Sequence, residues 1–165
     1  MNIFCSVTAA VLGAAAGIYF SRQLKERERI MTAAILLIKE LEVQIRYTNA
    51  EIGDMLRNSA DNEAYQKLLF VTECRKIEEK GNFHNIWSEG VKRQAYITER
   101  DRELLIALGE RLGETDAEGQ LSFLEMTEEM IKGQQQQAES DYKNKGKMYR
   151  SVGILCGLAM GIMVL

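Results

Sequence analysis

The first 21 residues, MNIFCSVTAAVLGAAAGIYFS (Met1–Ser21), decide the fold class because they contain no charged side chain. A helix of this length, at ~1.5 Å per residue, spans about 30 Å, which is the thickness of the hydrocarbon core of a bilayer. A secretory signal peptide carries basic residues before its apolar stretch, whereas in this sequence they follow it. The segment is therefore predicted to be a transmembrane helix.

The opposite end of the chain, Ser151–Leu165 (SVGILCGLAMGIMVL), is also free of charge. As a helix this segment reaches only about 22 Å, which is short for a membrane span. Met148 and Tyr149 can lengthen it if the neighbouring basic side chains extend along the helix toward the lipid headgroups. The segment is predicted to be a second transmembrane helix.

Basic residues border both apolar ends on the side that faces the middle of the chain, and no Lys or Arg lies beyond either end. The positive-inside rule therefore predicts that the central region is cytoplasmic and that both termini lie across the membrane. Binding of lipid headgroups is a secondary role for such residues. The flanking residues are Arg22, Lys25, Arg27, Arg29, Lys143, Lys145, Lys147 and Arg150.

Small residues recur every fourth position in both apolar ends. Residues at this spacing lie on one helix face, where the absence of large side chains allows two helix backbones to approach closely. The pattern predicts a packing stripe on each helix, and each stripe could face the other or another subunit. The predicted packing residues are Ala9, Gly13, Gly17, Gly153, Gly157 and Gly161.

The middle of the chain is predicted to be helical throughout. The 165 residues include no proline, where average usage of about 5% would give roughly eight. Proline is typical of turns and strand edges, so its absence favours long helices. We therefore predict an all-α protein, with an antiparallel helical bundle (residues 22–150) between two transmembrane helices (residues 1–21 and 151–165).

The first two helices are predicted from the apolar pattern and from helix-breaking residues. The first is expected to continue past the apolar end without a break before Gly53. A second is expected from about Glu63 to Lys80 and to stop at Gly81 and Asn82. The seam of the first helix, with its alternating spacing of four and three, consists of Ala34, Ile38, Leu41, Ile45, Thr48, Ile52 and Met55.

Later helices carry clearer boundary signals. Trp87 lies in a third predicted helix, and Thr98–Asp101 resembles a capping box at the start of the next one. Gly113 is expected to end that helix. The segment Thr115–Glu118 repeats the start signal, and one long helix is predicted from there to the C-terminus.

The residues needed for catalysis or metal binding are largely missing. His84 is the single histidine, which excludes zincin and di-iron histidine motifs, and no phosphate-binding glycine loop or nucleophile elbow occurs. Cys74 is more readily interpreted as a buried helix residue than as a nucleophile paired with His84. The net charge of −3 does not suggest a nucleic-acid partner. We expect no catalytic, metal or cofactor site.

Three stretches of the sequence resemble the stage III sporulation protein AB family. They are LEVQIRYTNAEI (Leu41–Ile52), LGERLGETDAEGQ (Leu108–Gln120) and KNKGKMYRSVGILCGLAMGIMVL at the C-terminus. Together with the two-span layout, they cover both ends and the centre of the chain. The similarity is weakest between Asn58 and Tyr96.

The resemblance implies a role in the secretion-like complex that connects mother cell and forespore in endospore-forming bacteria. It implies that the helical domain is similar to the cytoplasmic domains of type II secretion and type IV pilus platform proteins. By analogy, the protein would lie in the mother-cell membrane facing the forespore. Its bundle would dock the hexameric ATPase of the complex, the AA component.

Two hypotheses follow for the function. The first is a non-enzymatic membrane platform that binds other sporulation complex proteins, and that could also form homo-oligomers. The second is a membrane-anchored helical signalling or sensor module. Topology distinguishes them, because a sensor would more naturally expose its bundle outside the cytoplasm.

Overall fold

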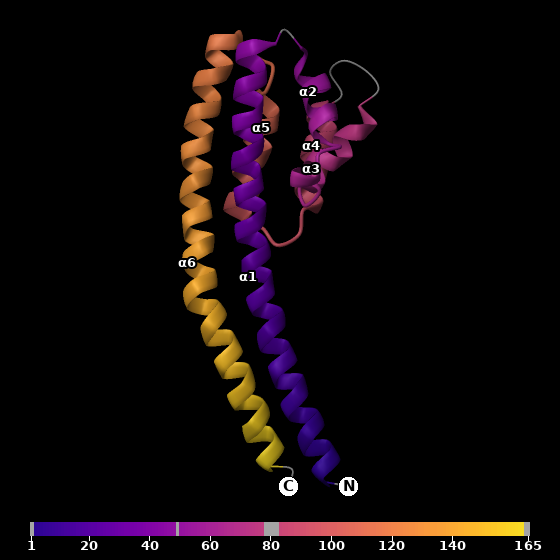
Figure 1. The fold of residues 1–165 in the computed structure, drawn as a ribbon, viewed down its shortest axis with the longest axis vertical. Coiled ribbons are helices and arrows are strands. Elements are labelled where there is room, and N and C mark those ends of the chain that lie inside the picture. The colour runs from indigo at the N-terminus through magenta and orange to yellow at the C-terminus, as the bar shows by residue number, and fades with distance from the viewer. Residues whose placement is uncertain (1, 49, 78–82, 164–165) are drawn as a thin grey trace. The chain divides into compact units, whose positions relative to one another are not determined.

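The computed structural model describes residues 2–48, 50–77 and 83–163, except for the side chains of residues 2–7, 9, 10, 160, 161 and 163. These residues form helices and no strand, which confirms the predicted all-α class and the helical bundle (Figure 1). The α-helices are α1 (Asn2–Tyr47), α2 (Ile52–Ser59), α3 (Leu69–Thr72), α4 (Phe83–Arg93), α5 (Glu99–Arg111) and α6 (Ala117–Met163). Two 3₁₀ helices, η1 (Glu63–Tyr65) and η2 (Glu73–Lys76), flank α3.

The chain divides into two compact units, and α1 and α6 contribute to both of them. The terminal unit consists of the first part of α1 and the last part of α6, residues 2–28 and 136–163. The central unit consists of residues 29–135 and contains all the shorter helices.

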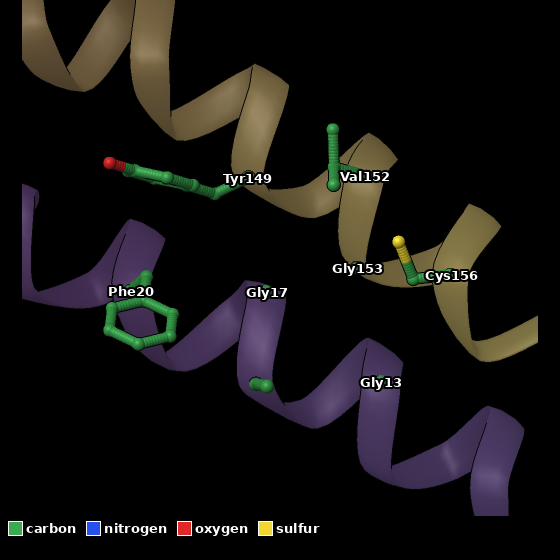
Figure 2. A pocket seen from close by; sticks show the side chains of 8 residues that line it. Gly13, Gly17, Phe20, Tyr149, Val152, Gly153 and Cys156 are labelled. Atoms are coloured by element: carbon green, nitrogen blue, oxygen red, sulfur yellow. The ribbon is translucent and has the colours of Figure 1, made fainter.

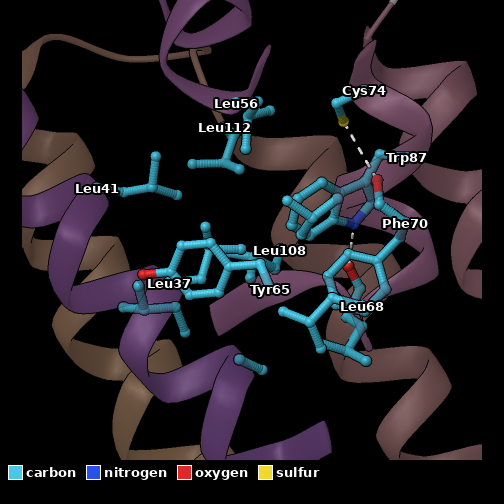
Figure 3. Close-up of a cluster of buried hydrophobic side chains, with 14 of the residues drawn as sticks. Leu37, Leu41, Leu56, Tyr65, Leu68, Phe70, Cys74, Trp87, Leu108 and Leu112 are labelled. Atoms are coloured by element: carbon cyan, nitrogen blue, oxygen red, sulfur yellow. Dashed lines mark hydrogen bonds between the residues drawn. The ribbon is translucent and has the colours of Figure 1, made fainter. Parts of the chain in front are cut away.

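The core of the central unit is built around Trp87, which is completely buried (Figure 3). Its indole Nε1 donates a hydrogen bond to the Leu105 carbonyl oxygen at 2.7 Å, and its ring centroid lies 4.6 Å from that of Phe70. Leucines of α1 and α5 and residues of α2 complete the cluster. The tryptophan thus buries a large apolar surface while its one polar group is satisfied.

Two glycines allow this close packing. A β-carbon added to Gly109 would lie 2.1 Å from Trp87 Cδ1, and one added to Gly90 would lie 2.4 Å from Phe70 Cα. These distances are far below any normal contact between carbon atoms. The absence of a side chain at both positions therefore determines how closely α4 approaches α5 and α3.

The boundary signals of α5 and α6 are confirmed. Thr98 Oγ1 accepts a hydrogen bond from the Asp101 amide, and the Asp101 carboxylate accepts one from the Thr98 amide, which is a complete capping box. Gly113 has a φ of +83°, a left-handed conformation that favours glycine after a helix end. Asp116 Oδ1 accepts from the Gly119 amide in the first turn of α6.

The prediction of one continuous helix as far as Gly53 is wrong, because α1 ends at Tyr47 and α2 begins at Ile52. Thr48 ends α1 with its hydroxyl donating to the Gln44 carbonyl at 2.7 Å, and it is exposed rather than part of a buried seam. The break lets the chain reverse, so that Ser59 lies against Glu40 of α1. A continuous helix would have carried the buried residues of α2 away from the core.

The predicted second helix from Glu63 to Lys80 is also wrong, because η1, α3 and η2 replace it and the chain is extended at Leu68 and Ile77. The predicted stop at Gly81 and Asn82 lies outside the described residues. Leu68, Phe70 and Val71 are all fully buried. Because they are nearly consecutive, one face of a regular helix could not have buried all three.

A buried polar cluster connects α1 to α2 and η1. The Glu40 carboxylate accepts hydrogen bonds from Ser59 Oγ at 3.0 Å and from the Tyr65 hydroxyl at 2.6 Å. Burial and this bond to Glu40 raise the pKa of Tyr65. Because each of these groups finds a partner, the cluster fixes where the returning chain contacts α1.

An acidic cluster lies between α1 and α6 in the central unit. Glu128 is 8% exposed, and its Oε1 lies 3.4 Å from Lys39 Nζ and 3.2 Å from Lys132 Nζ. Glu42 has a buried Oε1 with no hydrogen-bond partner. Burial, and the negative charges of Glu128 and Glu125, raise the pKa of Glu42.

Substitution of Gly109 by Ala should destabilise the central unit, because the added methyl group overlaps the Trp87 ring. Overpacking of this kind costs about 1–3 kcal/mol, measurable as a lower urea midpoint by circular dichroism of the full chain. Gly133→Ala is the matched control, since nothing lies within 4 Å of its added β-carbon. It should stabilise α6 by up to about 1 kcal/mol. Equal effects of both changes would contradict the packing role of Gly109.

Replacement of Glu42 by Gln should stabilise the protein at neutral pH. A carboxyl group with a raised pKa contributes stability below its unfolded pKa, about 4.3, and loses this contribution as the pH rises through the folded value. Glutamine cannot ionise, so the variant should exceed the wild type in unfolding free energy at pH 7 and approach it near pH 4. Glu114→Gln, at an exposed position, is the matched control for the removal of one carboxylate.

Candidate functional site

The glycine stripes of the two chain ends face each other in the terminal unit (Figure 2). A β-carbon added to Gly13 would lie 2.7 Å from Gly157 Cα, and one added to Gly17 would lie 2.5 Å from the Tyr149 carbonyl oxygen. A β-carbon on Gly153 would lie 2.9 Å from Gly17 Cα. The backbones of α1 and α6 are therefore in direct contact, which only glycine permits at these positions.

Ala9 and Gly161 are the two outer members of the predicted stripes. The side chain of Ala9 and the surroundings of Gly161 lie outside the described residues. For the other members, the sequence had left open whether the stripes face each other or another subunit. The structure brings Gly13, Gly17, Gly153 and Gly157 together within one chain, and their role inside a membrane stays a prediction.

Large apolar side chains of the same helix segments point away from the contact. Leu12 is 70% exposed and Leu155 is 65% exposed, whereas Gly17 and Gly157 are buried. A pair of helices in water buries its large apolar residues and exposes polar ones. In this pair the small residues are inside and the large apolar residues outside, among them Val11, Ile18, Val152, Ile154, Leu158 and Ile162.

Three aromatic residues lie where the apolar segments meet the charged ones. The ring of Phe20 lies 5.9 Å from the rings of both Tyr19 and Tyr149. Tyrosine side chains are enriched where helices cross the boundary between hydrocarbon and water. An aromatic cluster at this boundary was not predicted, although aromatic residues next to both apolar ends of the sequence are a usable signal.

The two predicted basic flanks lie at the same level along the antiparallel helix pair. Arg27 Nη1 lies 3.5 Å from Asp141 Oδ2, and Lys145 Nζ lies 2.7 Å from Asp141 Oδ1. Lys25 Nζ lies 5.8 Å from the centre of the Tyr142 ring. Asp141 therefore connects the two helices, a role that sequence reasoning missed because the partners are far apart in the chain.

The remaining flanking residues differ in their surroundings. Lys143 pairs with Glu139 on its own helix, and Arg150 Nε donates to the Gly146 carbonyl oxygen at 3.2 Å. Arg22 and Lys147 are exposed. Arg29 is also exposed, but it belongs to the central unit. The structure thus brings seven of the eight predicted flanking residues into the terminal unit.

The candidate nucleophile of the central unit is poorly suited to chemistry. Cys74 is fully buried, and its Sγ donates to the Phe70 carbonyl oxygen at 3.2 Å. Burial raises the pKa of this thiol to about 12, so it stays protonated at neutral pH. His84 Nδ1 instead lies 2.7 Å from the Gly109 carbonyl oxygen near the end of α5. Among the described residues, no His, Cys, Asp and Glu side chains group as metal ligands would.

Within the described residues, no helix combines the length and the apolar character required to cross a membrane. Met1, Val164 and Leu165 of the two predicted spans lie outside the described residues.

These features define a class of protein: an all-α helical bundle with a glycine-packed helix pair formed by its two chain ends. Comparison with known proteins identifies the family within this class. The sequence matches the family model described as "Stage III sporulation protein AB" over residues 2–165. The chain therefore belongs to the stage III sporulation protein AB family and functions in sporulation.

A solved structure, "Stage III sporulation protein AB (SpoIIIAB)", has a similar fold. Its TM-score is 0.55 at 18% sequence identity, and the similarity covers 71% of this chain and 96% of that chain. At this identity the likeness shows the fold alone. No curated protein matches the sequence.

Gly153→Leu should separate α1 from α6 in the terminal unit, because its side chain would overlap the Gly13 carbonyl oxygen and Gly17 Cα. The yield of crosslinking between native Cys156 and a cysteine introduced at Ala16, both of which line one groove, should fall by at least about fivefold. Ala159→Leu adds the same side chain at an exposed position and should leave the yield unchanged. An unchanged yield in Gly153→Leu would show that the glycine contact is dispensable.

Proposed function

We propose that this protein is a non-enzymatic membrane platform of a sporulation complex that connects mother cell and forespore. The apolar chain ends span the mother-cell membrane as a closely packed pair of helices. The central unit lies in the cytoplasm and docks the hexameric AA-type ATPase of the complex. No catalytic residue is assigned.

The observation that carries this proposal is the arrangement of side chains in the terminal unit. Glycines fill the contact between α1 and α6, while large apolar side chains such as Leu12 and Leu155 point outward. Lipid removes the hydrophobic drive between helices, so close backbone contact becomes the main source of packing energy. The outward apolar surface would be unfavourable in water and is favourable in hydrocarbon.

The boundary of the apolar surface supports the same orientation. Phe20 and Tyr149 lie at the end of the apolar segments, and the basic residues of both helices follow at one level. This order of apolar, aromatic and basic residues is typical of a helix that crosses from hydrocarbon into the cytoplasmic headgroup layer. It supports placement of the central unit on the cytoplasmic side.

The proposed platform role and the proposed docking of the ATPase are both inferred from the family resemblance. Members resemble platform proteins of type II secretion and type IV pilus systems, which couple a cytoplasmic ATPase to assembly outside the membrane. The buried core of the central unit supports a rigid docking module, because Trp87 and Phe70 fix its helices against one another. Such a module fits a scaffold that holds partners rather than one that performs chemistry.

The anchoring is tested by alkaline carbonate extraction of membranes from sporulating cells. The wild type should stay in the membrane pellet. The double variant with Leu12→Lys and Leu155→Lys should be extracted into the supernatant, since each lysine in hydrocarbon costs about 2.5–3.5 kcal/mol. Both leucines are exposed in the terminal unit. Gln137→Lys, at an exposed position of α6 within the charged segment, should stay in the pellet. Release of the wild type would refute membrane insertion.

Affinity purification of the tagged full-length protein tests the platform role. Enrichment of the AA-type ATPase is the expected outcome, and recovery of the protein without complex members would favour the sensor hypothesis. A protease-protection assay with a C-terminal tag separates the two topologies. The platform predicts that the tag is inaccessible from the cytoplasm.

A further inference from the structure

An apolar groove of about 450 Å³ runs along the helix pair of the terminal unit (Figure 2). The glycines of both helices leave this space open, and Ala16, Val152 and Cys156 line it. Phe20 and Tyr149 lie together at one end of the groove. Each lining side chain belongs to α1 or α6, so the groove is formed within one chain.

A basic side chain, Lys145, lies beyond the aromatic end of the groove. Lys145, Tyr149, Val152 and Cys156 follow one another at spacings of four, three and four residues, so they share one face of α6. Lys145 is therefore one helical turn beyond Tyr149, and its side chain is 54% exposed. Asp141, which accepts from Lys145, is also bound by Arg27 of α1.

The surrounding residues leave this end of the helix pair with a surplus of positive charge. Residues 22–28 and 139–150 contain seven Lys and Arg side chains but only four Asp and Glu side chains. This net charge of +3 belongs to the two segments that adjoin the apolar chain ends. The field at the groove end therefore attracts an anion.

We infer that the groove binds one acyl chain of an anionic phospholipid, with the phosphate against Lys145. This inference rests on the proposed membrane insertion. The order along the helix pair is the order within the lipid: an apolar channel, a pair of aromatic rings at the glycerol level, and a cation one turn further. A transmembrane helix from a second copy would fill the apolar channel, but it would not account for the cation at its end.

The test uses the full-length protein in detergent and native mass spectrometry with phosphatidylglycerol and with phosphatidylcholine of the same acyl chains. The wild type should retain one phosphatidylglycerol molecule in preference to phosphatidylcholine. Ala16→Leu fills the groove and should weaken retention of both lipids roughly tenfold. Ala15→Leu is the matched control, because Ala15 is exposed and its position is rotated by about 100° around the helix.

The charge is tested with a second matched pair. Lys145→Gln should weaken phosphatidylglycerol binding by about fivefold and phosphatidylcholine binding by less, because choline offsets the negative charge of the phosphate in the second lipid. Lys147→Gln removes the same charge from the opposite face of α6 and should keep the preference. An equal loss in both lysine variants would show a diffuse electrostatic effect and overturn the assignment of the site.

Two other results would overturn the proposal. Equal retention of the two lipids by the wild type would show that the groove end does not distinguish an anionic from a zwitterionic headgroup. A dimer that dissociates in Ala16→Leu would show that a second copy occupies the groove. Either result leaves the carbonate extraction unaffected, so failure of lipid binding is distinguishable from failure of membrane insertion.

Discussion

The direct contact between glycine backbones of α1 and α6 sets the register of the terminal unit. Once Gly17 lies against Gly153, Ser21 lies near Gly146 and Arg27 reaches Asp141. This register brings the two basic flanks to one level and places the aromatic rings together at their border. A single β-carbon on either glycine would push the helices apart and lose the dispersion contacts along the pair. The groove, the aromatic cluster and the shared carboxylate all follow from that contact.

Glycines also allow close packing in the central unit, but there they make room for large side chains. Gly109 and Gly90 let Trp87 and Phe70 fill a core formed mostly by short helices. In the terminal unit the glycines bring backbones together, and no large apolar side chain among its described residues is buried, whereas in the central unit glycines make room for the large ring of Trp87. The first arrangement suits a solvent of hydrocarbon and the second suits water, because only in water does burial of a large apolar ring provide the main driving force.

The regular parts of the fold could be predicted from the sequence, and the irregular parts could not. The capping box at Thr98 and the left-handed Gly113 are local devices, so nearby residues were enough to locate them. The break after Tyr47 and the irregular path from η1 to η2 depend on distant residues. Glu40 binds the returning chain, and Gln94 Oε1 accepts a hydrogen bond from the Leu69 amide, 25 residues earlier in sequence. Local periodicity contains no information about such partners.

The sequence by itself determined that the protein is helical, that its ends are apolar and flanked by basic residues, and that small residues recur on one face of each end. These properties follow from composition and spacing along a single helix. Only the tertiary structure decided that the glycine stripes face each other, that Asp141 joins the basic flanks, and that Glu128 is buried beside Lys39. Each of these depends on contacts between α1 and α6, whose residues lie far apart in the chain.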